Sequence, residues 1–355
     1  LKIDEKDREF LHAWPARHVE TFGPQLTLND QTKPLLESDV RFCALAARSF
    51  DTPAFLSSVL TVLRLAEPTF LDSLRRAMEN AKPIAAKGPD GLTGELLHAS
   101  QTKNGWIIIG AKGKNTYSGK DSVAFLADLG GDDSYKGLIA SSFDAKRPFS
   151  FLVDFAGNDD YDGAALGLAT GRLGCGCLID RAGDDTYKCA PGGGGCGFAG
   201  VGILVDESGK DTYSGTRFTL GAATAGIGLL LDLAGDDKYA AHGFSIAIGG
   251  PLGVGAVIDI AGDDEYKCGK HYPSGYNPSE APNAKPGDAN FQYDAFAMGI
   301  GLGRRLYPFW KEGEVYDLAG GFGVWIDVAG NDKSESSNFA QACAYYFGVG
   351  LKMDL

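Results

Sequence analysis

The octapeptide "DRAGDDTY", residues 180–187, decides the fold, because close variants of it recur along the chain at a constant spacing. Its first aspartate is here called the anchor, and anchors stand at positions 128, 154, 180, 206, 232 and 259, then at 327 and 354. Apart from the gap between 259 and 327, successive anchors are 26 or 27 residues apart. A fixed period of this length indicates a repeat architecture, in which each copy forms one structural unit.

A second signature precedes each anchor: Gly, apolar, Gly, three apolar residues, Asp, as in "GCGCLID", "GVGILVD" and "GIGLLLD". Short apolar runs separated by glycine-rich turns predict a mostly β fold, a right-handed parallel β-helix (solenoid) with one coil per period. Propeller blades are longer, at about 40 residues, and a leucine-rich repeat would show a leucine ladder. We therefore expect coils of about 26 residues, stacked about 4.8 Å apart.

The apolar runs also predict which side chains fill the solenoid. Because side chains alternate along a strand, residues five, three and one before each anchor share one face. We expect these to form the core ladders: Cys175, Cys177, Ile179, Val201, Ile203, Val205, Ile227, Leu229, Leu231, Val254, Ala256 and Ile258. The glycines between them serve close coil packing or, alternatively, leave a flat strip that another chain or a glycan could approach.

The chain divides into two unlike parts. Residues 1–104 have helical patterns, such as "DTPAFLSSVLTVLRLAEP" with Thr52 and Pro53 as start signals, so we expect an α-helical N-terminal region. Residues 105–355 carry the repeat. The long step after the anchor at 259 predicts two insertions in the solenoid, at 269–292 and 304–320.

The anchor and the residue five positions later are aspartate in all seven octapeptides, whereas the residue before this second aspartate varies and includes Lys210. In stacked coils the carboxylates would repel one another by roughly 1 kcal/mol per pair in water, and by roughly 3–4 kcal/mol at an effective dielectric of 20. Backbone N–H groups and the nearby Tyr hydroxyl could offset this repulsion, or Ca²⁺ could bridge successive coils. The predicted metal ligands are Asp128, Asp133, Asp154, Asp159, Asp180, Asp185, Asp206, Asp211, Asp232, Asp237, Asp259 and Asp264.

The segment "AGDDTY" resembles the Gly/Asp-rich turn of RTX-type β-roll repeats, which binds Ca²⁺ between coils. The resemblance covers about six residues per period and implies Ca²⁺ as a cofactor, although an RTX repeat is only roughly nine residues long. Aspartate-rich repeats of this kind are also similar to those of bacterial secreted proteins, so we expect a secreted, periplasmic or cell-surface location. The incomplete first copy has Gly110 and Asn115 at the two aspartate positions, as expected for a terminal capping coil.

The two insertions carry aromatic and basic residues that suit a sugar or peptide surface: Tyr272, Tyr276, Arg304, Arg305 and Trp310. They are also similar to the equipment of β-helix polysaccharide lyases, with His271 or Lys311 as the base and Arg304 as the carboxylate clamp. The alternative is that both insertions are structural loops or an oligomer contact.

Composition excludes some partners. The net charge of −13 and the pI of about 4.8 disfavour nucleic acid and anionic membrane surfaces, and no apolar run approaches the roughly 20 residues of a membrane span. The seven cysteines form no CxxC motif, and we expect buried thiols. Three hypotheses remain: a non-enzymatic extracytoplasmic binding or structural solenoid with a glycan or protein partner, a carbohydrate-active β-helix enzyme, and a subunit of a larger assembly or oligomer.

Overall fold

The computed structural model describes residues 3–21, 25–27, 33–84, 88–119, 122–142, 147–275, 284–307 and 317–355, with the backbone alone at 25–27 and 305–307. The helices precede the solenoid in sequence. They are α1 (Glu5–Thr21), α2 (Lys33–Ser49), α3 (Thr52–Leu63), the 3-10 turn η1 (Arg64–Ala66) and α4 (Pro68–Met78).

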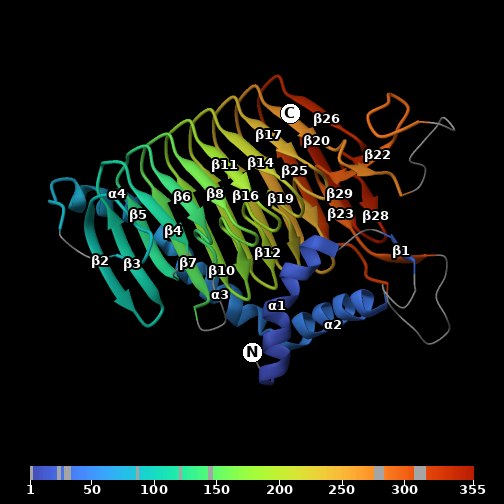
Figure 1. The fold of residues 1–355 in the computed structure, drawn as a ribbon, viewed down its shortest axis with the longest axis horizontal. Coiled ribbons are helices and arrows are strands. Elements are labelled where there is room, and N and C mark those ends of the chain that lie inside the picture. The colour runs from blue at the N-terminus through green and yellow to red at the C-terminus, as the bar shows by residue number, and fades with distance from the viewer. Residues whose placement is uncertain are drawn as a thin grey trace.

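Three sheets form the walls of the solenoid, whose coils stack along the horizontal axis of Figure 1. The ten-stranded sheet comprises β2 (Leu96–Thr102), β3 (Gly105–Gly110), β5 (Val123–Asp128), β7 (Phe149–Asp154), β10 (Cys175–Asp180), β13 (Val201–Asp206), β16 (Ile227–Asp232), β19 (Val254–Asp259), β25 (Phe322–Asp327) and β29 (Val349–Asp354). The eight-stranded sheet comprises β4 (Thr116–Gly119), β6 (Ser134–Gly137), β8 (Asp160–Gly163), β11 (Thr186–Cys189), β14 (Thr212–Gly215), β17 (Lys238–Ala241), β20 (Glu265–Cys268) and β26 (Lys333–Ser336).

The third wall is shorter. The six-stranded sheet comprises β9 (Gly171–Arg172), β12 (Gly197–Phe198), β15 (Ala223–Thr224), β18 (Ile248–Gly249), β23 (Ile300–Leu302) and β28 (Ala344–Tyr345). Two small sheets join β1 (Gln25–Thr27) to β24 (Arg305–Tyr307), and β21 (Tyr272–Pro273) to β22 (Tyr293–Ala297) and β27 (Asn338–Ala340).

Successive coils pair in register, because the same residues of each repeat lie opposite one another. Asp180 pairs with Asp154 on one side and Asp206 on the other, in parallel strands. The predicted fold class is confirmed: the protein is mostly β, with a parallel solenoid of about eight turns at a spacing of about 26 residues, preceded by four helices.

The helical region is shorter than the predicted range of 1–104. The described helices end at Met78, and residues 96–102 form β2, which pairs antiparallel with β3. A tight turn allows this hairpin, since Gly105 has φ +124° and the Thr102 hydroxyl donates to its carbonyl at 2.7 Å. The hairpin thereby covers the edge of the first parallel strands.

The predicted core ladders face the wrong way. The residue two before each anchor fills the interior, as Leu178, Leu204 and Leu230 do at 0% exposure, together with the anchor itself. Residues five, three and one before the anchor point outward instead. The glycine four before the anchor faces inward, and a Cβ on Gly202 would lie 2.1 Å from the carbonyl oxygen of Cys196. These inward glycines therefore serve close packing between the walls.

The outward apolar residues of the first coils are covered by helices. Leu71 of α4 packs against Phe151 and Cys177, and Val59 of α3 packs against Val201. Helices α1 and α2 cover the neighbouring corner of the solenoid (Figure 1). The helical region is thus an outer layer on the ten-stranded sheet.

All seven cysteines lie among the described residues, six of them buried and Cys343 partly exposed, and none forms a disulfide. Within the described residues no single helix is long and apolar enough to cross a membrane. The stretches Thr52–Ala66 and Pro68–Met78 meet that requirement only as a pair, which is bent by 45°.

Candidate metal centre

The anchor aspartates lie inside the solenoid, at the ends of the strands of the ten-stranded sheet. Asp206 is 0% exposed. Its Oδ2 accepts a hydrogen bond from the Tyr187 hydroxyl of the preceding coil at 2.6 Å, and its Oδ1 accepts from the Ser208 backbone N–H at 3.1 Å. The anchors at 128, 154, 180 and 232 follow the same arrangement.

The tyrosines form a continuous stack beside the anchors. The ring centroids of Tyr161, Tyr187 and Tyr213 are 4.7 Å apart, and the planes differ by only 4–5°. Burial raises the pKa of Tyr187 well above its usual value, so the hydroxyl stays a donor. Each tyrosine from Tyr117 to Tyr239 therefore ties its own coil to the anchor of the next one, whereas Tyr266 donates to Asp259 of its own coil at 3.3 Å. The sequence predicted a Tyr donor, but not that it acts between coils.

The second aspartates form a separate column that also links coils. The backbone N–H of Asp159 donates to Oδ1 of Asp185 at 2.6 Å, and the N–H of Asp185 donates to Oδ1 of Asp211 at 2.6 Å. One oxygen of each carboxylate is thus satisfied by a backbone N–H of the preceding coil, whereas the local turn hydrogen bonding expected from the sequence is found at the anchors. The other oxygen is buried and accepts from no N–H or hydroxyl donor among the described residues, although a proton shared with the anchor carboxyl would satisfy it, as between Asp185 and Asp180. This holds for Oδ2 of Asp133, Asp159, Asp185, Asp211, Asp237 and Asp264.

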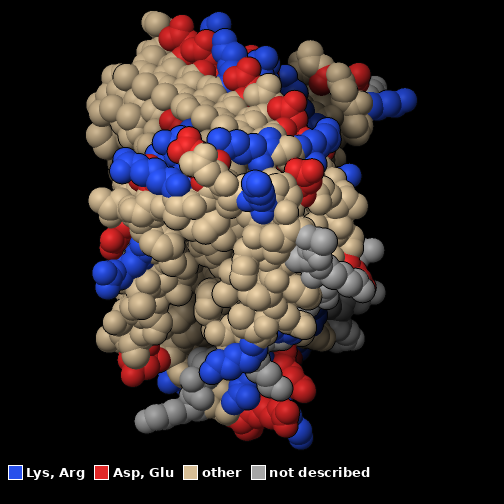
Figure 2. Space-filling model, turned by 90° about the vertical axis from the view of Figure 1, so that its left-hand side faces the viewer, with Lys and Arg blue, Asp and Glu red and all other residues tan. Residues whose placement is uncertain are grey.

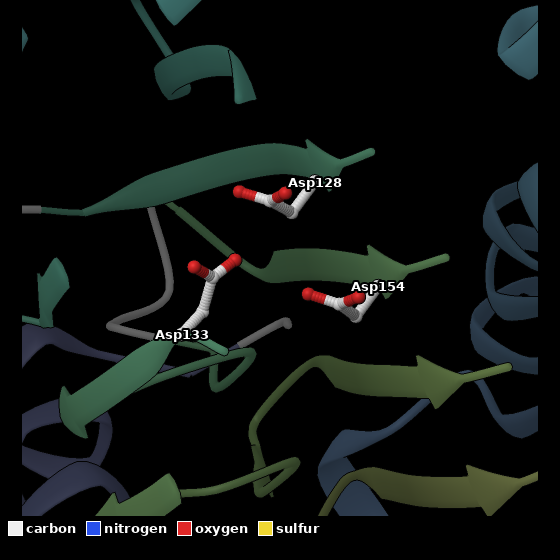
Figure 3. Close-up of side chains that lie close together, drawn as sticks. All are labelled: Asp128, Asp133 and Asp154. Atoms are coloured by element: carbon white, nitrogen blue, oxygen red, sulfur yellow. The ribbon is translucent and has the colours of Figure 1, made fainter. Parts of the chain in front are cut away.

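These unpartnered oxygens are aimed at the anchors. Figure 3 shows Asp128 and Asp154 projecting in the same direction from neighbouring strands, with the carboxylate of Asp133 turned toward them. One carboxylate oxygen from each of these three residues lies within 4.8 Å of the others, and the same grouping recurs at least four more times along the solenoid. The second aspartates are only 1–3% exposed, so each group is shielded from solvent.

Burial and mutual repulsion raise the pKa values of these carboxyl groups. Burial, followed by the charge of Asp180, raises the pKa of Asp185 to about 10, and burial with the charge of Asp232 raises that of Asp237 to about 9. Burial likewise raises the pKa of Asp264 to about 8. The ionised ladder is therefore costly unless a cation or a proton is bound to it.

The donor set suits a hard cation. The described groups around each site are carboxylates and a Tyr hydroxyl, and Ca²⁺ prefers carboxylate oxygens in flexible geometry. Each coil contributes one anchor and one second aspartate, so one divalent cation per coil would balance the two ionised carboxylates. A single proton per coil would balance only one of them.

Sequence reasoning missed a third ladder, on the surface. The residue before the second aspartate is exposed, as predicted, but its side chain caps the next coil: Asn158 Oδ1 accepts from the Asp184 N–H at 2.9 Å, and Asp184 Oδ1 accepts from the Lys210 N–H at 3.0 Å. The Lys210 ammonium then reaches Asp236 at 2.8 Å. The recurrence of Asp and Asn at this position was the available signal.

The first coil replaces the two carboxylates with uncharged residues. Nδ2 of Asn115 donates to Oδ2 of Asp128 at 2.9 Å, and the Asn115 backbone N–H donates to Asp133 at 2.6 Å. At the anchor position Gly110 leaves room, since a Cβ there would lie 2.1 Å from both Oδ2 of Asp128 and the Tyr117 hydroxyl. The predicted capping coil thus ends the carboxylate columns with an amide donor.

Arg304, predicted as a substrate clamp, is 0% exposed and pairs with Asp39 of α2. Asp39 also accepts from Nε1 of Trp14 at 3.1 Å, and burial lowers the pKa of Arg304 to about 9. The guanidinium therefore anchors the helical layer to the solenoid, and the clamp role does not fit this position. Asp39 itself was not singled out from the sequence.

The other predicted insertion residues have different neighbours. His271 stacks on His242 with ring centroids 4.1 Å apart, and Tyr272 packs edge-on against Phe244. Arg305 lies in β24, with its side chain outside the described set. Three predicted residues lie outside the described residues: Tyr276, Trp310 and Lys311.

Positive and negative side chains are mixed on the surface at the end of the solenoid that holds the first coil. Figure 2 shows acidic and basic side chains interspersed there, with broad uncharged areas between them. That face therefore carries no extended single-sign patch of the kind that steers highly charged partners.

The chain matches no protein-family model, no curated protein and no solved structure with which it was compared. The function is therefore inferred from the residues of the carboxylate ladder themselves.

Proposed function

We propose that this protein is a non-enzymatic binding or structural solenoid of the extracytoplasmic space, stabilised by Ca²⁺ ions bound between its aspartate columns. The observation that carries the proposal is the unpartnered, buried Oδ2 of the second aspartate, which points at two anchor carboxylates in coil after coil. Buried carboxylate oxygens without a partner are rare, because losing their hydration costs free energy.

Charge balance favours a divalent cation over protons as the group that neutralises the ladder. With one Ca²⁺ per coil both aspartates stay ionised, which leaves the anchor free to accept the hydroxyl and backbone hydrogen bonds described above. With one proton per coil a net negative charge remains in every coil, at a spacing of about 4.8 Å. Repulsion over that distance is roughly 3–4 kcal/mol per neighbouring pair at an effective dielectric of 20.

The chemistry of the sites supports the proposed extracytoplasmic location. Groups of three carboxylates with few further donors suit weak Ca²⁺ sites, and extracellular modules work with dissociation constants of about 10⁻⁴ to 10⁻³ M. Such sites would be filled outside the cell and not in the cytosol.

The test is metal analysis of the purified chain after equilibration with saturating Ca²⁺, followed by thermal unfolding with Ca²⁺, Mg²⁺ or EGTA. We expect roughly one Ca²⁺ per inner coil and a melting temperature that EGTA lowers by on the order of 10 °C, since each site filled at 100 times its dissociation constant adds about 2.7 kcal/mol. Mg²⁺ should restore less, because it demands near-octahedral geometry and keeps its waters.

A matched pair of variants locates the effect. Asp185→Asn removes a buried ligand and should reduce the Ca²⁺-dependent rise in melting temperature, whereas Asp184→Asn changes its exposed neighbour and should leave that rise unchanged. A chain that contains no metal and melts at the same temperature with Ca²⁺ and with EGTA would refute the proposal.

The carbohydrate-active alternative has no comparable support. Arg304 is buried against Asp39, and the predicted base Lys311 lies outside the described residues. Binding of a glycan at the insertions stays a prediction.

A further inference from the structure

The outward face of the ten-stranded sheet is covered over only part of its length. On β7 and β10, Phe151, Val153 and Cys177 are buried beneath η1 and α4. On β13, Val201 is buried beneath α3. The interface between helices and sheet therefore uses the outward apolar ladder as its contact surface.

The same ladder continues beyond the helices in the same register. Ile227 pairs with Val254, and Val254 pairs with Phe322, in adjacent parallel strands. These three side chains are 37%, 39% and 55% exposed, respectively. Leu252, at the corner that leads into β19, is 59% exposed. An uncovered row of large apolar side chains is unusual on a soluble surface and marks an interaction site.

The position just after the anchor widens this apolar surface. In the covered part it carries two buried apolar residues, Leu129 and Phe155, followed by Arg181, which pairs with Asp72 of α4 at 3.1 Å and with Glu207 at 2.8 Å. In the uncovered part the equivalent residues are all apolar: Leu233, Ile260 and Val328. The uncovered face thus keeps this column apolar in every coil and lacks the charged pairs that Arg181 makes in the covered part.

A groove leads from the helical layer onto this face. One side of the groove is formed by Ala46 and Phe50 at the end of α2 and by Phe55 of α3. The other side is formed by Ile227 and Val254, and the groove has a volume of about 280 Å³. The uncovered ladder therefore begins beside the existing helices and continues their interface.

The area of the uncovered face indicates whether a second copy of the chain or a smaller element, such as a helix, would cover it. Three strands spaced about 4.8 Å apart, each about 20 Å long, present on the order of 300 Å². A stable dimer buries roughly 800 Å² on each partner, so this face is too small to hold a second copy by itself. A helix is about 10 Å across, and one or two helices would cover the face as α3 and α4 cover the first coils.

We infer that the outward face of β16, β19 and β25 is a docking site for an amphipathic helix of a partner protein, which extends the layer formed by α3 and α4. Such a helix would place apolar residues at i, i+3, i+4 and i+7 against Ile227, Val254 and Phe322. The inference does not depend on the Ca²⁺ proposal, since it rests on the outer surface of the sheet and not on the interior ladder.

The probe is a fluorescein-labelled peptide of residues 52–78, the sequence of α3 and α4, added to the intact chain. We expect saturable binding with one peptide per chain in fluorescence anisotropy, weakened at least tenfold by the double substitution Val254→Lys and Phe322→Lys. A peptide carrying Leu71→Asp and Leu74→Asp should not bind, because its apolar face is lost. The control is the double substitution Thr212→Lys and Ala240→Lys, which adds the same two charges at exposed positions of the eight-stranded sheet and should bind like the unmodified chain.

Three results would overturn the inference. They are an absence of saturable binding, equal binding to the double variant and to the unmodified chain, and a dimer in light scattering that the double variant converts to a monomer. The last result would assign the face to a second copy. Circular dichroism and the melting temperature check that each variant is folded, which we expect because the substituted side chains are exposed.

Discussion

The first coil of the solenoid carries Gly110 and Asn115 where the coils behind it carry two aspartates, although the tyrosine stack and the strand register are the same in both. In the first coil an amide donates to Oδ2 of Asp128. In the inner coils a second carboxylate occupies the equivalent place, and its Oδ2 has no donor among the described residues. The fold therefore does not require a carboxylate at this place, and the inner carboxylates need a further explanation, which a bound cation supplies.

The largest expected difference between the two regions is their response to pH without metal. The pKa values of Asp185, Asp237 and Asp264 are about 10, 9 and 8 in the folded chain, above the ordinary value of about 3.8 that the unfolded chain should retain. Groups with a raised folded pKa contribute stability that is fully present below the unfolded pKa and is lost as the pH rises through the folded pKa. In EGTA the free energy of unfolding should therefore fall by several kcal/mol in total between pH 4 and pH 10. The melting temperature should fall with it.

Calcium should reverse that trend, since protons compete with the metal for the same oxygens. With saturating Ca²⁺ we expect the melting temperature to rise between pH 4 and pH 7. Hydrogen exchange should show the inner coils loosening with pH in EGTA before the strands around Asn115. A profile that is independent of pH in EGTA would contradict the raised pKa values.

The next largest effect should come from giving the first coil a side chain at its anchor position. Gly110→Ala places a Cβ 2.1 Å from two fixed oxygens, so we expect a loss of about 3 kcal/mol or more of unfolding free energy. Gly113→Ala in the same turn is the control, because its Cβ would have nothing within 4 Å, and it should change stability by less than about 0.5 kcal/mol. Urea denaturation measures both. If Gly110→Ala lost as little unfolding free energy as Gly113→Ala, the close packing around Gly110 would be able to relax.

Exchanging the amide and the carboxylate between the two regions tests the comparison directly. Asn115→Asp removes a donor and adds a buried charge, and it should cost about 2–3 kcal/mol in EGTA at pH 7. Asp185→Asn should instead stabilise the chain in EGTA by about 1–2 kcal/mol, because the amide avoids the cost of protonation. Urea denaturation in EGTA measures both changes, and two changes of the same sign would remove the distinction between the first coil and the others.

The smallest difference between the two regions concerns the tyrosine hydroxyls. Tyr187→Phe keeps the ring in the stack but removes the donor to Asp206, which we expect to cost about 1.5–3 kcal/mol. Tyr117→Phe should cost less, about 1 kcal/mol, because Asn115 still donates to Asp128. Chemical denaturation of the two single variants gives the difference. A larger loss for Tyr117→Phe would show that the amide does not substitute for the hydroxyl.

The repeat itself predicted most of the fold. The spacing of the anchors gave the coil length and the strand register, because identical residues recur at identical places in each coil. The interior could not be assigned in the same way. Alternation along a strand separates two faces without saying which is inside, and the buried face here contains Gly176, Leu178 and the carboxylate of Asp180, which looks less apolar than the outward face.

The contacts of the insertions were beyond sequence reasoning for a different reason. Arg304 meets Asp39 across 265 residues of chain, and nothing in the local pattern of either residue indicates the other. The paired aspartates, by contrast, were identifiable because their type is constant while their neighbours vary. The sequence could not predict that the second oxygen of each carboxylate has no hydrogen-bond donor, because this depends on the three-dimensional arrangement of the coils.

The in-register linkage between coils also bears on how such a chain can change in length. Each coil from Asp154 to Asp232 offers a Tyr hydroxyl and a backbone N–H to the coil after it and accepts the same two groups from the coil before it. A duplicated or deleted stretch of 26 residues, starting anywhere in the run from Asp154 to Asp206, would leave the donors and acceptors of both aspartate columns matched. Insertions of other lengths would interrupt both columns. The molecule can therefore lengthen or shorten by whole coils, as a polymer does by monomers, without redesign of its interior.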